Sequence, residues 1–426
     1  MSNYSSLFIL LALIAIVYLL DRKNFKKEGT LFYLRRTEKG LKFIETFSAK
    51  HKKFFGIFAD LGIIFSFGTL GAWYLFKSKK STGILLKTIL SFSIFYIVFG
   101  VLLKTMFSGV LSLFGASGFI VAYLLKSAID IVSAPAAVAA VQFVLPVNIP
   151  NAPIFYVPMD LWLISIFIIL VAHEFSHAFV AKAQGINVKA LGYGFLAILP
   201  LGFAEPDEKQ IKKSKSLVKT RVYGAGSFAN FIVALITIPL LLGVIFAYSH
   251  SVDVTGVSYN GTISDMPADG VLPVSGTITM ISGNETRDIY NLSLVLNSFS
   301  PGDKISVTVD GADYDLILTS NPDNESRAFV GISNLEQETV NIIPGRIGGI
   351  IVSVLLYLAT LLNFIFGLNL GIGLFNLLPI KPLDGGFMFD EIVKATGMSR
   401  LKNVARFVSI SVLILLMFNI LVPFVL

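Results

Sequence analysis

Two histidines and a glutamate lie within five residues of one another in an apolar part of the sequence. The segment His173-Glu174-Phe175-Ser176-His177 follows twelve uncharged residues that begin at Leu161. On a helix, His173 and His177 share one face, where both imidazoles can bind one zinc ion. Glu174 is rotated by about 100° from His173, so that it can act on a water molecule instead of binding the metal. The pattern H-E-x-x-H therefore predicts zinc-dependent hydrolysis with Glu174 as general base.

A hydrolytic zinc site has a third protein ligand. The chain contains no cysteine, and its other histidines, His51 and His250, lie in a basic loop and at the end of an apolar run. We therefore expect a carboxylate, from either Glu205 or Asp384. Asp384 is preferred because prolines precede it in residues 376–386, and irregular backbone at membrane depth must line a cavity or be buried in protein. The predicted ligands of a single zinc ion are thus His173, His177 and Asp384.

The composition indicates a membrane protein. Hydrophobic residues make up 54% of the 426 residues and charged residues only 14%, against about 25% charged residues in ordinary soluble domains. The net charge of +7 does not indicate nucleic-acid binding, because the charges lie in loops between long apolar runs. The run 347–380 exceeds the roughly 20 residues of one span, so we expect a helix followed by an irregular piece. The runs expected to lie in the bilayer are 1–20, 54–76, 84–103, 105–125, 157–182, 222–249, 347–380 and 407–426.

The distribution of charge predicts how the chain is oriented. Residues 21–53 hold eleven Lys or Arg against four Asp or Glu, and residues 204–221 hold six against three. Because cytoplasmic loops are enriched in Lys and Arg, we expect these loops and residues 381–406 to be cytoplasmic. Residues 251–340 hold thirteen acidic and three basic residues and are therefore expected outside the cytoplasm. That segment also carries N-x-S/T sequons at Asn260, Asn284, Asn291 and Asn324.

The first 150 residues are harder to interpret. The turn Lys77–Lys80 is basic, yet counting spans from the 21–53 loop places it outside the cytoplasm, so the number of spans before residue 157 stays open. The basic segment 21–53 is a solvated face, a contact with anionic lipid or a substrate-docking element. Of these three interpretations, the solvated face is preferred.

The acidic segment 251–340 is expected to form a small α+β module. Strand patterns occur at 252–258, 276–281 and 304–309, the last followed by a turn at Asp310-Gly311, and helical spacing occurs at 288–299. This order resembles a PDZ domain of the kind found in membrane and periplasmic proteases. PDZ domains bind an extended peptide at a sheet edge, which implies a peptide ligand. The alternative is an inert β-rich lid.

Three motifs together resemble the site-2 protease family of intramembrane zinc metalloproteases, in its PDZ-containing prokaryotic and archaeal type. They are H-E-x-x-H in an apolar run, N-x-x-P-x-x-P-L-D-G from Asn376 to Gly385, and Gly226-Ser227-Phe228-Ala229-Asn230 as G-x-x-x-N. The stretch 202–208 is similar to the family's membrane-re-entrant β-hairpin and the loop that follows it. The resemblance covers residues 157–425 and leaves 1–150 unexplained.

The resemblance implies the same zinc ligands and the same general base as the residue pattern. It further implies that Asn376 and Asn230 hold the substrate backbone or stabilise the oxyanion. The alternative for both amides is helix–helix hydrogen bonding, worth about 0.6–2 kcal/mol. Lys381, three residues before Asp384, can extend to the cytoplasmic surface, which predicts a zinc site near that face.

These patterns predict a polytopic α-helical membrane protein with an inserted extracytoplasmic PDZ-like α+β domain. The expected parts are an accessory membrane region (1–150), the first part of the catalytic core (151–250), the PDZ-like domain (251–340) and the second part of the core (341–426). The resemblance implies regulated intramembrane proteolysis as the function, in which the chain hydrolyses peptide bonds within or near the transmembrane segments of membrane-anchored regulatory proteins.

Two other classes of protein were weighed against the protease. A zinc transporter or a metal-sensing membrane receptor is the alternative, and it is disfavoured because the sequence has no recognisable internal repeat. A catalytically inactive scaffold would have lost part of H-E-x-x-H or the aspartate, and all of these residues are present.

Overall fold

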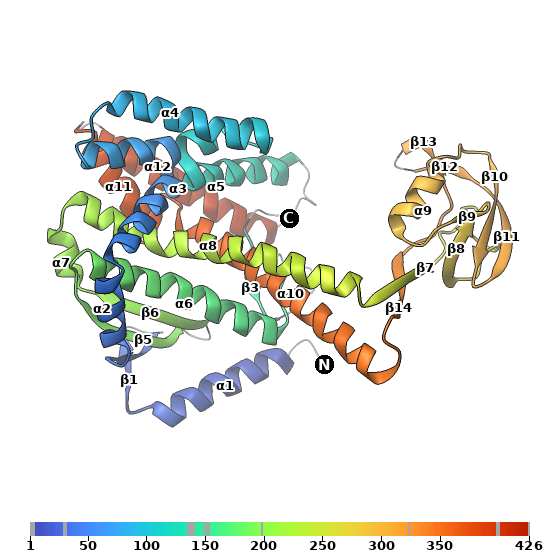
Figure 1. Cartoon of the computed structure of the whole chain (residues 1–426), viewed down its shortest axis with the longest axis horizontal. Helices are drawn as coiled ribbons and strands as arrows, with labels where there is room; N and C mark the ends of the chain where they lie inside the picture. Colours follow the sequence, from blue (N-terminus) through green and yellow to red (C-terminus); the bar gives the residue numbers. More distant parts are fainter. Residues whose placement is uncertain are drawn as a thin grey trace. The chain divides into compact units, whose positions relative to one another are not determined.

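The computed structural model describes residues 5–28, 32–133, 141–147, 149, 154–196, 199–322, 324–397 and 401–424. The chain forms two compact units, one of Met1–Pro239 with Leu361–Leu426 and the other of Leu240–Thr360. Figure 1 shows the helices and strands of both units.

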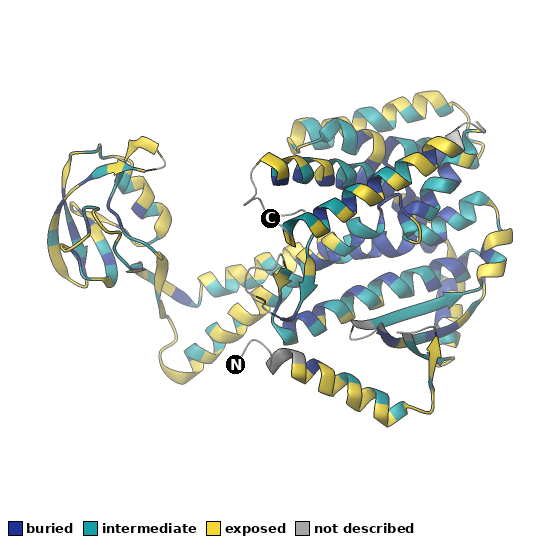
Figure 2. Cartoon of the chain, turned by 180° about the vertical axis from the view of Figure 1, so that it is seen from behind, coloured by how far each residue is buried: buried dark blue, intermediate teal, exposed yellow. Residues whose placement is uncertain are grey.

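Seven helices among the described residues are long and apolar enough to cross a membrane. No residue of α4 is buried (Figure 2). Two of its leucines, Leu85 and Leu86, are 75% and 72% exposed. Apolar surface of this extent is suited to lipid contact, and the prediction of a multi-pass membrane protein is confirmed. The seven are α3 (Lys52–Ser78), α4 with the π-helix η1 (Ile84–Leu102), α5 (Ser108–Ser133), α6 (Met159–Ala183), α8 (Ser216–Ser249), α10 (Gly345–Asn376) and α12 (Leu401–Leu421) with η2 (Val422–Phe424). The apolar α1 (Ser5–Asp21) is shorter.

Helix α3 reverses direction instead of continuing as one straight span. Phe67 and Gly68 have non-helical dihedral angles, with φ of +52° at Gly68. Lys79 Nζ lies 2.6 Å from Asp60 Oδ2, whereas 19 residues of straight helix would separate these positions by about 28 Å. The expected span 54–76 is therefore wrong as a single crossing, because a glycine in the left-handed region folds the second arm back on the first.

A second break lies against the first one. Gly115 divides α5 and also has a positive φ, of +61°. A side chain at Gly68 would lie 2.6 Å from the backbone nitrogen of Gly115, and Thr69 Oγ1 donates to the carbonyl of Ser112 at 2.7 Å. The two broken helices therefore cross at their glycines, where no other residue type leaves enough room.

A four-stranded antiparallel sheet packs beside α6. The hairpin of β5 (Val188–Leu196) and β6 (Leu199–Pro206) corresponds to the predicted re-entrant hairpin, of which residues 197 and 198 lie outside the described residues. Two further strands come from the N-terminal region, β1 (Phe25–Glu28) and β2 (Phe32–Thr37), and the strand order is β1-β2-β5-β6. Because β2 pairs with β5 from Phe32↔Leu196 to Thr37↔Leu191, β6 is an outer strand of the sheet.

The basic segment 21–53 is thus more than a solvated loop. Besides β1 and β2 it contains α2 (Leu41–Lys50), whose buried Ile44 packs against Ala178 of α6 and Leu191 of β5. The preferred interpretation of this segment was incomplete, because its basic residues alternate with apolar ones that pack on the core.

The remaining elements of this unit are short. Helix α7 (Glu208–Lys213) follows the sheet, and α11 (Asp384–Ala395) follows the irregular residues 377–383. The irregular piece expected in 347–380 therefore begins only after α10 has ended at Asn376. In the apolar segment 131–159, the structure describes the parallel strands β3 (Phe143–Leu145) and β4 (Ile154–Tyr156), while residues 134–140, 148 and 150–153 lie outside the described residues.

The second unit contains an antiparallel sheet in the order β11-β10-β8-β7-β14, with β9 paired to β8. Leu292 of the helix α9 packs against Val257, Ile278 and Val307 of the sheet. The expected strands, helix and hairpin of this segment are confirmed. The elements are β7 (Val252–Asn260), β8 (Ser275–Ile281), β9 (Asn284–Glu285), α9 (Ile289–Leu296), β10 (Lys304–Val309), β11 (Ala312–Ile317), β12 (Thr319–Asn321), β13 (Asn324–Phe329) and β14 (Glu336–Asn341).

Candidate metal centre

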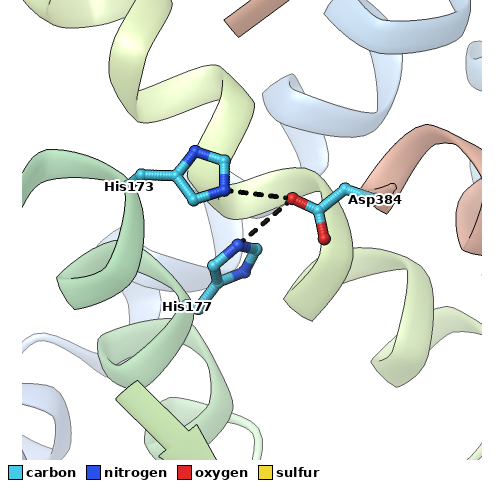
Figure 3. Close-up of side chains that lie close together, drawn as sticks. All are labelled: His173, His177 and Asp384. Carbon is cyan, nitrogen blue, oxygen red and sulfur yellow. Dashed lines mark ion pairs between the residues drawn. The ribbon is translucent and has the colours of Figure 1, made fainter. Parts of the chain in front are cut away.

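Three side chains converge where α6 meets the start of α11. His173 and His177 project from one face of α6, and the Nε2 atom of each points to Oδ2 of Asp384, at 3.3 Å and 3.2 Å (Figure 3). The ligand atoms of the three residues all lie within 4.8 Å of one another. All three side chains are at most 16% exposed. The structure therefore brings together the three residues that the sequence predicts as zinc ligands.

The position of Asp384 depends on the two glycines that follow it. A side chain at Gly385 would lie 2.6 Å from the carbonyl oxygen of Leu378, and one at Gly386 would lie 2.6 Å from the backbone nitrogen of Lys381. The first turn of α11 therefore packs directly on the irregular segment 377–383, and this packing holds Asp384 against α6.

The second nitrogen of each imidazole is also engaged. His177 Nδ1 lies 2.7 Å from the carbonyl oxygen of Val222 on α8, so that Nδ1 carries the proton and Nε2 keeps its lone pair. His173 Nδ1 lies 3.2 Å from Nδ2 of the fully buried Asn230. With its carboxamide turned by 180°, Asn230 would accept the Nδ1 proton through Oδ1, an atom that has no other partner. Both histidines can thus present Nε2 to a metal ion.

Gly226 leaves the space in which the two Nε2 atoms lie. A methyl group at this position of α8 would lie 2.6 Å from Nε2 of His173 and closer still to Nε2 of His177. The glycine of the G-x-x-x-N pattern therefore faces the metal-binding atoms, and the asparagine of the same pattern contacts His173.

Glu174 lies next to the histidines in sequence but is held by the sheet. Its Oε2 atom accepts a hydrogen bond from the backbone N–H of Ala204 on β6, at 3.0 Å. It is absent from the group of three potential ligands. The predicted general base is therefore fixed between α6 and the outer strand of the sheet.

The other candidates of the sequence lie elsewhere. Glu205, the alternative third ligand, bonds Arg36 of β2 at 2.7 Å, and its side chain is 37% exposed. Hydrogen bonds from Arg36 to Glu28 and Glu205 raise the pKa of this arginine. Asn376 is half-buried at the end of α10. It is not part of the group of three.

Sequence reasoning missed three contributions to the site. Two are backbone groups, the carbonyl of Val222 and the N–H of Ala204, and a sequence carries no signal for such contacts. The third is the space left by Gly226. The G-x-x-x-N pattern marked this glycine, but the sequence alone did not show why a glycine is needed there.

The group fits a zinc ion. Two neutral imidazole nitrogens and one carboxylate oxygen are a ligand set of hydrolytic zinc sites, which leave a fourth position for water. The Oδ2 atom of Asp384 is buried and accepts no hydrogen bond from the described residues, and a cation bound between it and the two Nε2 atoms would satisfy it.

Comparison with known proteins assigns this site to a family. The sequence profile of peptidase family M50 matches residues 161–419, which include all three potential ligands. The chain belongs to peptidase family M50. The match leaves out the first 160 residues, among them α1 to α5 and strands β1 to β4.

Two other proteins are similar to this chain in sequence. An uncharacterized protein of Methanocaldococcus jannaschii is 27% identical over 242 residues, which are 55% of this chain and 59% of that protein. A Clostridium perfringens protein named "Putative zinc metalloprotease" is 26% identical over 290 residues, which are 53% of this chain and 84% of that protein. The chain thus spans about three fifths of the length of the first relative. The predictions of a zinc metalloprotease and of zinc as its cofactor are confirmed.

Proposed function

We propose that this M50 peptidase hydrolyses peptide bonds within or near the transmembrane segments of membrane-anchored regulatory proteins. The observation that carries the proposal is the group of two histidines and one aspartate, of which both histidines lie on α6, a helix that is long and apolar enough to cross a membrane. Ionisable groups in such helices are costly and mark functional sites.

In this proposal, His173, His177 and Asp384 hold the zinc ion. When bound, the ion lowers the pKa of a water molecule to about 7 and polarises the scissile carbonyl. The Val222 carbonyl holds His177 in the tautomer that leaves Nε2 unprotonated, and Asn230 does the same for His173 when its carboxamide is turned so that Oδ1 faces Nδ1. Asn230 therefore has a positioning role in addition to the predicted contact with the substrate or oxyanion, which it would share with Asn376.

Glu174 transfers the proton in the hydrolysis. Its carboxylate takes one proton from the attacking water as the oxygen bonds to the carbonyl carbon, and returns that proton to the leaving nitrogen as the C–N bond breaks. The N–H of Ala204 holds Oε2 of this carboxylate, which leaves the other oxygen for the water. The products are a new carboxyl terminus and a new amine.

The sheet offers a place for an unwound substrate. A transmembrane helix hides its carbonyl groups, so its backbone must extend before a peptide bond is attacked. Strand β5 lies between β2 and β6 and has no edge left for a further strand. Strand β6 is an outer strand of this sheet and lies beside α6. We propose that the extended substrate pairs with β6, next to Glu174.

We further propose that the zinc site lies near the cytoplasmic face and the acidic unit outside the cytoplasm. His177 lies six residues before the end of α6, and Asp384 begins α11, so the site is close to the basic segments 204–221 and 381–406. The reversal of α3 supports this orientation, because Lys77 Nζ bonds the carbonyl of Ala395 at 2.6 Å. The basic turn Lys77–Lys80 then lies on the same side as the other basic segments. In this arrangement, the acidic unit is a PDZ-like domain that binds an extended peptide at a sheet edge.

Replacement of Glu174 by Gln tests the proposal. Gln keeps an oxygen that can accept the Ala204 N–H bond but cannot take a proton, so cleavage of a reporter transmembrane substrate in proteoliposomes should be lost while zinc stays bound. Glu205→Gln makes the same chemical change outside the site and should keep activity. Cleavage by the Glu174→Gln variant at the normal rate would refute the assignment, and zinc flux into the vesicles would support a transporter.

A further inference from the structure

Arg221 connects three helices beside the metal centre. Its Nε and Nη2 atoms bond both carboxylate oxygens of Asp60 on α3, at 2.9 Å and 3.0 Å. Its Nη1 atom bonds Oε1 of Gln184, the residue that follows α6, at 3.0 Å. The side chains of Asp60 and Arg221 are 12% and 17% exposed. Lys79, at the end of the returning arm of α3, adds a second positive charge to Asp60.

Arg221 is followed in sequence by Val222, a residue of α8 that contacts one of the proposed zinc ligands. The carbonyl of Val222 accepts the Nδ1 proton of His177. His177 is on α6, and Gln184, seven residues later, directly follows the end of the same helix. Arg221 therefore fixes the end of α6 to the beginning of α8, the two helices between which the His177–Val222 hydrogen bond forms.

Helix α3 is close enough to α8 to take part in this arrangement. A side chain at Gly62 would lie 3.1 Å from the carbonyl oxygen of Gly224. One or two turns earlier on α8, Tyr74 bonds Ser216 and Thr220 at 2.8 Å and 2.9 Å. The Tyr74 hydrogen bonds and the Asp60–Arg221 pair both join α3 to α8. Only the Asp60–Arg221 pair also reaches α6, because Arg221 bonds Gln184 as well.

We propose that Asp60 and Arg221 are positioning residues of the zinc site, through which the N-terminal region outside the M50 match sets the orientation of His177. A planar, bidentate guanidinium–carboxylate pair is geometrically specific, so the pair determines the spacing of α6 and α8. Changes to the direct hydrogen-bond partner of a metal ligand typically alter metal affinity or activity by about 10–100-fold, and Arg221 acts on such a partner, the Val222 carbonyl, through the adjoining backbone. The inference rests on the proposed role of His177 as a zinc ligand.

The test measures zinc affinity of the full-length protein in detergent, by competition with a chelator, together with the melting temperature of the metal-free protein. Arg221→Lys keeps the charge but loses the bidentate pair, and it should weaken zinc binding by roughly tenfold or more. Gln184→Ala removes only the bond to the end of α6 and should weaken zinc binding in the same direction by a smaller factor. Tyr74→Phe is the matched control, because it breaks an α3–α8 contact without changing Arg221, and it should leave zinc affinity unchanged.

The outcomes distinguish failure of the positioning role of Asp60 and Arg221 from failure of the proposed zinc site. Normal zinc affinity in both Arg221→Lys and Gln184→Ala, with zinc lost in His177→Ala, would overturn the positioning role alone. Equal losses of zinc affinity in Arg221→Lys, Gln184→Ala and the Tyr74→Phe control, accompanied by lower melting temperatures, would also overturn it in favour of general helix docking. Normal zinc affinity in His177→Ala would overturn the proposed zinc site itself.

Discussion

Gly226→Ala is the substitution by which the space in the metal centre is tested most directly. The added methyl group would lie 2.6 Å from Nε2 of His173, and unstrained non-bonded atoms lie about 3.5 Å apart. The imidazole would therefore have to move by about 0.9 Å, and that of His177 by more. Metal sites tolerate ligand displacements of about 0.2 Å, and a misplacement of about 1 Å can lower activity by about 100-fold. We expect a decrease of that size in kcat/KM, equivalent to about 2.7 kcal/mol.

The assay compares this variant with Gly243→Ala on the same helix. A methyl group at Gly243 has no atom within 4 Å, so this control makes the same chemical change without the steric effect. Because alanine favours helix by roughly 1 kcal/mol over glycine, both variants should remain folded. Zinc content and cleavage of a transmembrane reporter are measured for each. Normal zinc content and normal activity in Gly226→Ala would show that the two Nε2 atoms do not face this glycine.

Three further predictions concern the zinc ligands and the pH dependence of stability. Asp384→Ala should lower zinc affinity by more than the roughly 10–100-fold typical of outer-shell changes, whereas equal zinc binding in this variant would exclude Asp384 as a ligand. A chelator should abolish cleavage and added zinc should restore it, and activity that persists without zinc would contradict the cofactor. Burial alone would raise the pKa of Glu391, but the hydrogen bond and charge of Lys394 hold it below the ordinary value of 4.5. Its contribution to stability is therefore present above pH 4.5 and lost as the pH falls through the lower folded-state pKa; Glu391→Gln should reduce the fall in melting temperature below pH 4.5, and an unchanged pH profile would contradict this.

The residues that carry chemistry were more predictable than the parts that support them. His173 and His177 follow helical spacing within one helix, and Asp384 could be selected because prolines and glycines surround it in an otherwise apolar region. The return of α3 was missed because its turn depends on the backbone of one glycine, Gly68, in a run whose composition fits a straight span. Hydropathy counts apolar residues but contains no information on a reversal of direction.

Contacts between distant segments were likewise outside the reach of local patterns. The pairing of β2 with β5 joins residues that are about 160 positions apart, and the sequence of 32–37 is basic enough to be interpreted as a loop. Glycines at 192 and 194 make the pairing sterically possible, since a side chain at Gly194 would lie 2.7 Å from Leu34. The steric need for glycine at these two positions becomes evident only once the partner strand is known. The role of the acidic unit as a PDZ-like domain stays a prediction.

The composition of the sheet has a consequence for how the protein is made. A ribosome completes β1 and β2 well over a hundred residues before it reaches β5 and β6, and at about 5–20 residues per second this interval lasts roughly ten seconds or more. During that time β2 has an unpaired edge, while α3, α4 and α5 are already available for insertion into the bilayer. Closing so long a loop is entropically costly, so the sheet beside Glu174 is expected to form late. The newly made chain would then remain without proteolytic activity until most of its helices are in the membrane.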